Sequence, residues 1–433
     1  MINSFPGYEF KRLEDGNMHN IYRGTDVGFG GYVYAEPGMA SNVALLDVGN
    51  MHGASIIALN KFGDYTERYV ELRNARMAIK KGLKTGDFTE ASKMLDGKLA
   101  KYLTSPEDAD ALQNAIKWVL NSTYGIAAAT FDNPLHDSRD LNNIVALRGA
   151  LFMRTLQDEI TTRGFQVFHI KTDSVKVPNA TPELIDFIID FGRQYGYEFE
   201  HECTYERICL VNDAVYIARY DDQGVRNKGG KHAGEWTATG KQFQVPYVFK
   251  TLFSHEPIEF DDLCETMSVM TALYLRDPET GALTFVGRVG QFCPIKPECG
   301  GKELVRVSKD IDGNDKFSAA TGTKGYLWLE SEVVRNLGKE DDIDRSYYDE
   351  LVNKAKEAIS KFGDFDEFVD VSKPFTTSDP DFHSCPLYRE KTPDPCETDY
   401  CWDCPYSHVN IHEPWTQPDI CEKGYNIADL IPF

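Results

Sequence analysis

The sequence predicts an α+β fold in which antiparallel strands and long helices occur in the same chain. Residues 165–177 consist of two apolar runs separated by a polar tip at residues 171–174, which is the pattern of a β-hairpin. Residues 42–46 form another short apolar run, typical of a buried strand. Residues 106–129 repeat apolar side chains with the helical period over a stretch too long for an ordinary strand. Strands and helices are therefore both expected.

The helix at residues 106–129 has N-terminal signals and two distinct faces. Ser105 can cap it, and the proline that follows suits the first helical position. The predicted core face consists of Leu112, Ala115, Ile116, Val119 and Leu120. Lys117, Asn121 and Tyr124 are spaced by four and three residues, so they share another face. A cation, an amide and an aromatic ring in one row can hold the phosphates, sugar and base of a nucleotide.

Two carboxylates lie at the ends of predicted strands. Asp173 is at the tip of the hairpin, where an isolated Asp is most often a turn former. Asp47 ends the short strand and is followed by a glycine-bearing turn and an apolar helix start at residues 48–57. A carboxylate at a strand end can hold a divalent cation, while the exposed N–H groups beside it receive phosphate oxygens. The pair predicts a site for a metal ion and a phosphate group.

Several segments, in this order, resemble motifs of the polymerase core of family B (Pol α-like) DNA polymerases, in a bacteriophage version. Residues 30–33 resemble the family's YxGG segment, although Gly28 replaces its Tyr. Residues 47–52 resemble motif A, DxxSLYPS. Residues 117–125 match motif B, KxxxNSxYG, at every fixed position.

The hairpin tip carries the last of these motifs. Residues 171–174 resemble motif C, DTDS, with Lys171 in place of its first Asp. The resemblance implies that only the second Asp, here Asp173, is a required metal ligand. It covers roughly residues 26–250 and implies a right-hand polymerase fold with an antiparallel-sheet palm, helical fingers and a thumb, here followed by a Cys-rich C-terminal extension.

The resemblance and the element pattern together divide the chain into successive regions. The expected regions are an N-terminal arm (1–25), a first palm segment (26–61), fingers (62–130), a second palm segment (131–220), a thumb (221–290) and the Cys-rich extension (291–433). The 25 residues before the palm have no room for the family's exonuclease region. We therefore expect no proofreading in this chain, and a separate exonuclease or N-terminal polymerase subunit as a partner.

The resemblance also implies how the site works. Asp47 and Asp173 would hold two Mg²⁺ ions, and Lys117 would contact the phosphates and give a proton to pyrophosphate. The other expected nucleotide-binding residues are Val48, Gly49, Asn50, Met51, His52, Arg76, Lys80, Asn121 and Tyr124. His52 stands where the family has a Tyr that packs under the sugar and excludes a 2′-hydroxyl. The smaller imidazole ring predicts weaker rejection of ribonucleotides.

Contacts to primer–template DNA are expected from several regions of the chain. The candidate DNA-binding residues are Gly125, Lys171, Tyr216, Arg219, Lys228 and Lys231. Tyr216 fits the Tyr of the family's KKxY-like segment, but Asp213 stands where a Lys is usual. Arg219 or Lys228 can compensate for that change.

The leading prediction is a template-directed DNA polymerase core that adds dNTPs to a primer. One alternative is a catalytically degenerate polymerase-fold protein that binds DNA or acts as a scaffold, which Lys171 and Asp213 favour. Another is a related nucleotidyl transferase, such as a primase-like or terminal transferase. Activity on primed against unprimed or untemplated strands separates the last class from the first.

Composition is compatible with these functions. The 433-residue chain has room for about three domains, and its net charge is −22. A negative total does not exclude DNA binding, because a local basic channel is enough. No apolar run reaches the roughly 18 residues that span a membrane, and the first residues show no secretion signal. We expect a cytoplasmic protein, in the host cytoplasm if it comes from a phage.

Seven of the ten cysteines follow residue 290. Zn²⁺ is the preferred metal for this region, and four thiolates could hold it: those of Cys385, Cys396, Cys401 and Cys404. The spacing also suits a [2Fe–2S] cluster, and His408 or His412 can replace a thiol. Unliganded cysteines are the remaining alternative. Cys293 and Cys299 fit core positions better than a second metal site.

Overall fold

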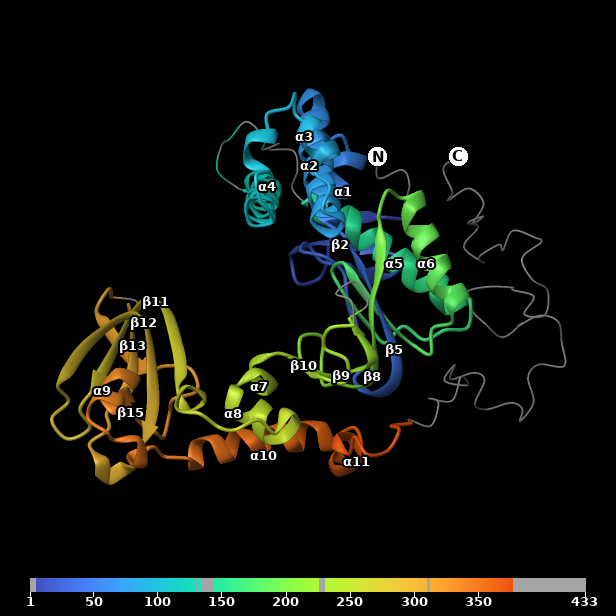
Figure 1. Ribbon diagram of the computed structural model, residues 1–433. Coiled ribbons are helices and arrows are strands. Elements are labelled where there is room, and N and C mark those ends of the chain that lie inside the picture. Colours follow the sequence, from blue (N-terminus) through green and yellow to red (C-terminus); the bar gives the residue numbers. More distant parts are fainter. Residues whose placement is uncertain are drawn as a thin grey trace. The chain divides into compact units, whose positions relative to one another are not determined.

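The computed structural model describes residues 5–129, 131, 133, 135, 143–225, 230–309 and 312–376. The chain forms two compact units (Figure 1). Within the described ranges, unit 1 consists of residues 5–36, 42–204 and 376, and unit 2 consists of Pro37–Ser41 and Tyr205–Phe375. Both units mix helices with antiparallel strands, which confirms the α+β class.

Unit 1 is built on a sheet with the strand order β8, β5, β7, β6, β4. Its strands are β4 (Val33–Ala35), β5 (Gly38–Val48), β6 (His169–Lys171), β7 (Ser174–Pro178) and the first half of β8 (Phe199–Leu210). Strands β6 and β7 form the predicted hairpin, and β5 pairs antiparallel with β7. Ala44, Leu46 and Val48 of β5 enter the core, so the side chain of Asp47 lies on the opposite face.

Two helices contribute the rest of this core. They are α5 (Ile144–Thr162) and α6 (Pro182–Gln194). Figure 1 shows both helices beside the sheet. Thr181 caps α6 by accepting a hydrogen bond from Leu184 N, and Gly164 has the left-handed φ of 81° expected after α5.

The chain between β5 and α5 forms a layer of helices that has its own apolar core. It contains α1 (Met51–Ala58), α2 (Thr66–Thr85), α3 (Thr89–Lys93) and α4 (Pro106–Ala128). The Ser105 hydroxyl caps α4 by accepting from Asp108 N at 3.1 Å, as the sequence predicts. Ile116 and Leu120 are buried, but Ala115 and Val119 are exposed, so the expected core face was too wide. Helix α4 packs mainly on the single helix α2, which covers only a narrow face.

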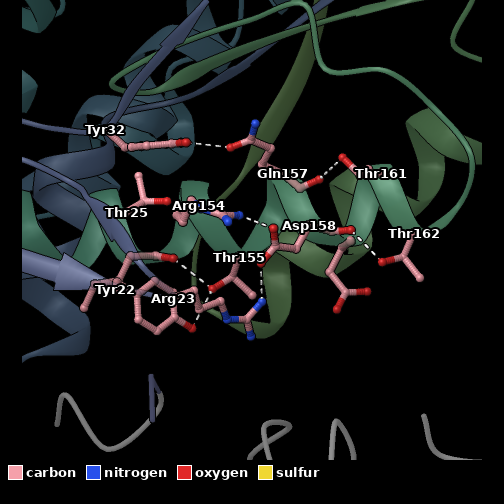
Figure 2. A network of polar contacts seen from close by, with 12 residues as sticks. Tyr22, Arg23, Thr25, Tyr32, Arg154, Thr155, Gln157, Asp158, Thr161 and Thr162 are labelled. Atoms are coloured by element: carbon pink, nitrogen blue, oxygen red, sulfur yellow. Dashed lines mark hydrogen bonds and ion pairs between the residues drawn. The ribbon is translucent and has the colours of Figure 1, made fainter. Parts of the chain in front are cut away.

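The N-terminal arm expected at residues 1–25 contains regular strands in its described part. They form a three-stranded antiparallel sheet from β1 (Glu9–Arg12), β2 (Met18–Tyr22) and β3 (Thr25–Asp26). Figure 2 shows how this segment is fixed to α5: Arg23 contacts Asp158 at 2.6 Å, and the hydroxyls of Tyr22 and Thr155 lie 3.1 Å apart. Phe5 and Tyr22 of this segment are also buried in the core of unit 1 with residues of α5, so apolar packing and polar contacts together order the segment.

Unit 2 continues from the second half of β8 through β9 (Tyr216–Val225) and β10 (Trp236–Thr239). Short helical segments follow at α7 (Lys241–Gln244), α8 (Pro246–Phe249) and a π-helical turn at Lys250–Ser254. A five-stranded sheet has the order β14, β13, β11, β12, β15. Its strands are β11 (Glu265–Arg276), β12 (Leu283–Ile295), β13 (Glu303–Lys309), β14 (Asp315–Ala319) and β15 (Leu327–Glu330).

Helices close unit 2 on its C-terminal side. They are α9 (Ser331–Asn336), α10 (Ser346–Ser360) and α11 (Phe365–Val369). The short 3₁₀-helices of the chain are Gly63–Tyr65, Ala100–Tyr102, Phe260–Leu263, Pro297–Cys299 and Glu340–Asp342. None of the helices in the described ranges combines the length and apolarity that a membrane-spanning segment needs.

Strand β12 runs through residue 290, where the sequence had suggested that a thumb ends and an extension begins. That boundary therefore lies inside a strand rather than in a linker. Cys299, expected in the core like Cys293, is only half-buried, whereas Cys293 is a fully buried core residue. Its Sγ lies 3.4 Å from that of Cys264, in the core of unit 2.

Candidate active site

The fold of unit 1 brings Asp47 and Asp173 to one edge of the sheet. Asp47 lies opposite Ser174 in the pairing of β5 with β7. The next backbone N–H, of Val48, donates to the carbonyl of Asp173 at 2.9 Å. Thr172, at the tip, has a left-handed φ of 57°, which turns the chain between β6 and β7. The predicted hairpin thus places the two carboxylates next to each other.

Both carboxylates lie in an electronegative, half-buried environment. Burial raises the pKa of Asp47 to about 7, and the nearby charges of Asp173, Glu202 and Glu200 add to the rise. Burial also raises the pKa of Asp173, although a hydrogen bond from its own backbone N–H and the charges of nearby groups oppose this. A divalent cation between the two carboxylates would offset the cost of burying their charges and would lower both pKa values.

The donor set of this pair fits a hard cation such as Mg²⁺, which prefers carboxylate oxygens and keeps several non-protein ligands. Among the described residues, no group of three or more His, Cys, Asp or Glu side chains is arranged to enclose a metal ion. Two carboxylates leave coordination positions of such an ion for water or substrate oxygens.

Lys176 is a charged residue of this region that sequence reasoning missed. Its side chain is buried, and its Nζ lies 3.1 Å from Nδ1 of His169 on the neighbouring strand. Burial lowers the pKa of Lys176 to about 8, while the charges of Cys203, Asp47 and Glu202 act in the opposite direction. Side chains alternate between the two faces of a strand, so Lys176 lies on the same face as Ser174. This alternation was the signal that could have identified Lys176 from the sequence. In the sequence, Lys176 stands within an apolar run, between Val175 and Val177.

The glycine pair before β4 packs against the hairpin tip. A Cβ atom on Gly31 would lie 2.9 Å from Cγ2 of Thr172, and the φ of Gly31 is 132°. The backbone N–H of Thr172 donates to the carbonyl of Tyr32 at 3.0 Å. Because only glycine allows both the close approach and this φ, Gly31 holds the tip beside β4.

Strand β5 leads into α1 through a tight, hydrogen-bonded turn. Asn50 has a left-handed φ of 66°, and its side-chain oxygen accepts from Gly53 N at 3.3 Å. The N–H groups of Val48 and Gly49 already donate to Asp173 and Glu198 carbonyls. The expectation that residues 48–52 all offer N–H groups to phosphate was therefore too broad. Only Asn50, Met51 and His52 remain as candidates.

His52 and Tyr124 meet as a stacked pair of rings. Their centroids are 4.2 Å apart at an interplanar angle of 23°. The Tyr124 hydroxyl accepts from Nδ2 of Asn143 at 3.1 Å, and the same amide donates to the carbonyl of Phe29. Burial lowers the pKa of His52, and its Nδ1 is buried with no hydrogen-bond partner in the described ranges of the chain. The imidazole is thus held in place with one nitrogen available.

The cations predicted on two helices gather in one region of unit 1. Arg76 and Lys80 are half-buried on α2, and Lys117 is exposed on α4. Burial lowers the pKa of Lys80, and the charges of Arg76, Lys84 and Lys117 lower it further, while Glu200 raises it. Burial also lowers the pKa of Arg76, whose Nε has no partner among the described residues. Clustered, incompletely paired cations suit a polyanionic ligand.

The other residues predicted to bind nucleotide, DNA or metal make few contacts with this site or lie elsewhere in the chain. Asn121 and Gly125 are exposed on α4, and Lys171 is exposed at the end of β6. In unit 2, Tyr216 and Arg219 lie on β9, where the guanidinium of Arg219 contacts the carboxylate of Glu206. Lys231 follows in a bridge to Val225. Lys228, Cys385, Cys396, Cys401 and Cys404 lie outside the described residues, as do His408 and His412.

The chain matches no protein-family model, and no curated protein matches its sequence. Among solved structures, it is similar to the family B DNA polymerase from the hyperthermophilic archaeon Pyrobaculum calidifontis, with a TM-score of 0.41 and 13% sequence identity. The similarity covers 80% of this chain and 49% of that chain, so this chain spans about half the length of the archaeal protein.

Proposed function

We propose that this chain is the core of a template-directed, DNA-dependent DNA polymerase that transfers nucleotides from dNTPs to a primer 3′-hydroxyl. The observation that carries the proposal is the pairing of β5 with β7, which places Asp47 beside Asp173 on the strand that leads into α1. The stacked rings of His52 on α1 and Tyr124 on α4 connect this carboxylate pair to the helix that carries Lys117. A metal-binding edge facing clustered cations is what nucleotidyl transfer from a triphosphate requires.

Each side of the site has a separate task in this proposal. Asp47 and Asp173 would hold the two Mg²⁺ ions, which would supply activation of the 3′-hydroxyl and charge neutralisation at the triphosphate. Arg76, Lys80 and Lys117 bind the phosphates, and Lys117 returns a proton to the leaving pyrophosphate. These cations orient the triphosphate before transfer, because three fixed charges restrict its position.

The aromatic pair serves the nucleoside portion of the substrate. His52 lies under the sugar, and Tyr124 supports the nascent base pair on the same stacked platform. Met51 and His52 offer backbone N–H groups from the first turn of α1, and Asn121 contributes an amide from α4. Asn143 fixes the orientation of Tyr124 through its hydroxyl.

The structural elements take the family's names only within this proposal. The sheet of unit 1 with α5 and α6 corresponds to a palm, α2 and α4 to fingers, and a portion of unit 2 to a thumb. The proposed partners are primer–template DNA and a separate exonuclease or N-terminal subunit. The proposed location is the cytoplasm, which would be that of the infected host if the chain comes from a phage. The C-terminal cysteines are proposed to bind Zn²⁺.

A degenerate, DNA-binding scaffold is the alternative, and one observation favours it. Lys171 replaces the first Asp of motif C and is exposed beside the carboxylate pair, at the end of β6. A cation there weakens the negative potential that attracts Mg²⁺. A scaffold protein of this kind would bind DNA without extending a primer.

Primer extension with dNTPs and Mg²⁺ tests the proposal. We expect extension dictated by the template, and a loss of more than about 100-fold in Asp173→Asn, because loss of a metal ligand exceeds the usual cost of losing an outer contact. Asp190→Asn, on the exposed surface of α6, is the matched control and should keep full activity. DNA binding with no extension by the wild-type chain, alone or with added cell extract, would instead support the scaffold.

A further inference from the structure

We propose that a cavity within unit 2 binds a nucleoside phosphate, either free or as the terminal nucleotide of a strand. The cavity has a volume of about 530 Å³ and lies between the α7–α8 segment, the β14–β15 turn and α10. Its lining includes Lys241, Lys324, Lys354, Tyr326 and Tyr347. Nothing in the polymerase proposal uses these residues, so the two proposals stand or fall separately.

The floor of the cavity is apolar and rigid. Val245 and Tyr347 are buried there, beside the half-buried Leu351. The rings of Tyr326 and Tyr347 meet edge to face, with centroids 5.0 Å apart at 83°, and Tyr347 also contacts Trp328. The half-buried ring of Tyr326 is therefore held in one orientation. A fixed aromatic face on an apolar floor suits the flat surface of a nucleobase.

The rim of the cavity carries positive charge in excess. Three lysines line it against a single acidic residue, Glu350. Lys354 pairs with Glu350 at 3.4 Å, and Lys241 with Glu265 at 3.4 Å. Lys324 is exposed and has no ion-pair partner among the residues that the structure describes. The charge of Lys324 therefore suits an anionic group at this rim.

A preorganised turn adds hydrogen-bond donors at the same rim. Thr323 N donates to Ala320 O at 3.1 Å, so Thr321 and Gly322 are the central residues of the turn, and both line the cavity. The φ of Gly322 is 82°, as the third position of a type II turn requires. The Thr323 hydroxyl donates to Leu304 O, and Trp328 Nε1 donates to Thr323 O. These buried bonds fix the turn in place.

A nucleoside phosphate matches all three features together. The volume is in the range of small-ligand sites, roughly 300–1,000 Å³. The base would lie on the Tyr326 side, and the phosphate would lie against Lys324, Lys354 and the exposed turn. A purely apolar ligand leaves the lysines unused, and an inorganic anion leaves the aromatic floor unused. The chemistry is the same for a free nucleotide and for a strand terminus.

Calorimetric binding of dAMP to the full chain, without divalent cations, tests the site. We expect Lys324→Met to weaken binding about tenfold and the Lys324→Met/Lys354→Met pair about 100-fold, because each lysine makes a charge-assisted contact. Lys316→Met, at another exposed lysine on β14, should have no effect. Adenosine, which lacks the phosphate, should bind at least about tenfold more weakly than dAMP. Unchanged thermal unfolding of the variants confirms that they are folded.

Further arms separate the sources of the nucleotide and the competing site. If a 5′-phosphorylated tetranucleotide binds more tightly than dAMP, and Lys324→Met removes that advantage, the ligand is a strand terminus. If dAMP binds more tightly than the tetranucleotide, the ligand is a free nucleotide. Binding of dAMP at the site of unit 1 instead would leave the affinity of Lys324→Met unchanged. The proposal is overturned if dAMP does not bind, if Lys324→Met binds it as tightly as the wild type, or if Lys316→Met weakens binding equally.

Discussion

His52 is stacked on Tyr124 at a ring separation of 4.2 Å, although one ring lies on α1 and the other near the end of α4. The two helices are far apart in the sequence, yet this contact connects the segments that resemble motifs A and B. Neither ring can be replaced without changing the surface that the other offers. The pair therefore sets the shape of the proposed sugar and base subsite.

Sugar selectivity should respond to the size of the residue at position 52. His52→Tyr extends the ring toward the sugar, so we expect discrimination between dATP and ATP to rise about tenfold, the usual effect of added bulk in a tight pocket. The measurement is the ratio of kcat/KM for the two nucleotides in primer extension. His232→Tyr in unit 2 is the matched control. An unchanged ratio in His52→Tyr would show that this ring does not contact the sugar.

Mg²⁺ affinity should depend on pH around the raised pKa of Asp47. A carboxyl with a pKa of about 7 is mostly protonated below that pH, and a metal ligand must lose its proton. Affinity should therefore fall by about tenfold for each pH unit below 7 and level off above it. Calorimetric titration of the full chain with Mg²⁺ across this range measures the effect. Equal affinity on both sides of pH 7 would contradict it, and Asp47→Asn should remove the dependence together with most of the binding.

The features of the site that could be predicted depend on local signals. The hairpin tip with Asp173 and the capped helix α4 follow from turn residues, from Ser105 and from a regular period, all of which act within a few residues. Their neighbours in sequence decide their conformation. The structure keeps these elements within a few residues of the expected positions.

The missed features depend on contacts between distant segments. Lys176 and Glu202 reach the site through the register of β7 and the order of strands, which no local pattern specifies. The N-terminal strands are short, and they are ordered by burial of Phe5 and Tyr22 in the core of unit 1 together with the pair of Arg23 with Asp158 of α5. Likewise, the N–H groups of Val48 and Gly49 are occupied by the carbonyls of residues far along the chain.

The stability contributed by His19 should depend on pH. Nδ1 of His19 lies 2.6 Å from Asp26, and Nε2 lies 2.9 Å from Asp15. The hydrogen bonds to Asp26 and then Asp15 raise the pKa of His19 above 6.5. Because the folded-state pKa is raised, the stabilisation is fully present below pH 6.5 and is lost as the pH rises through the higher value.

His19→Gln should therefore lower the Tm most at acidic to neutral pH, and the difference from the wild type should shrink toward alkaline pH. Thermal unfolding at a series of pH values measures this difference. His255→Gln, on the exposed surface of unit 2, is the control and should show no such trend. A Tm difference that stays constant with pH would mean that His19 acts through packing rather than charge.

Arg207 should be one of the most costly residues to replace in unit 2. Its side chain is fully buried and donates to three main-chain carbonyls, those of Phe368, Asp370 and Lys373, at distances of 2.9, 3.0 and 2.9 Å. It also donates to the carboxylate of Glu206 at 2.6 Å. Arg207→Met keeps the aliphatic volume but leaves these acceptors without their donor. We expect unfolding to become easier by about 3–5 kcal/mol, the usual cost of breaking a buried charged network.

Arg276→Met is the matched control, because Arg276 forms a single ion pair with Glu303 at the surface and should cost about 1 kcal/mol or less. Urea unfolding followed by tryptophan fluorescence suits both variants, since the ring of Trp236 packs on Phe368 beside the network. Equal losses in the two variants would show that the carbonyls around Arg207 find other donors, most simply water. A large loss confined to Arg207→Met would establish that this one guanidinium holds the segment after α11 against β8.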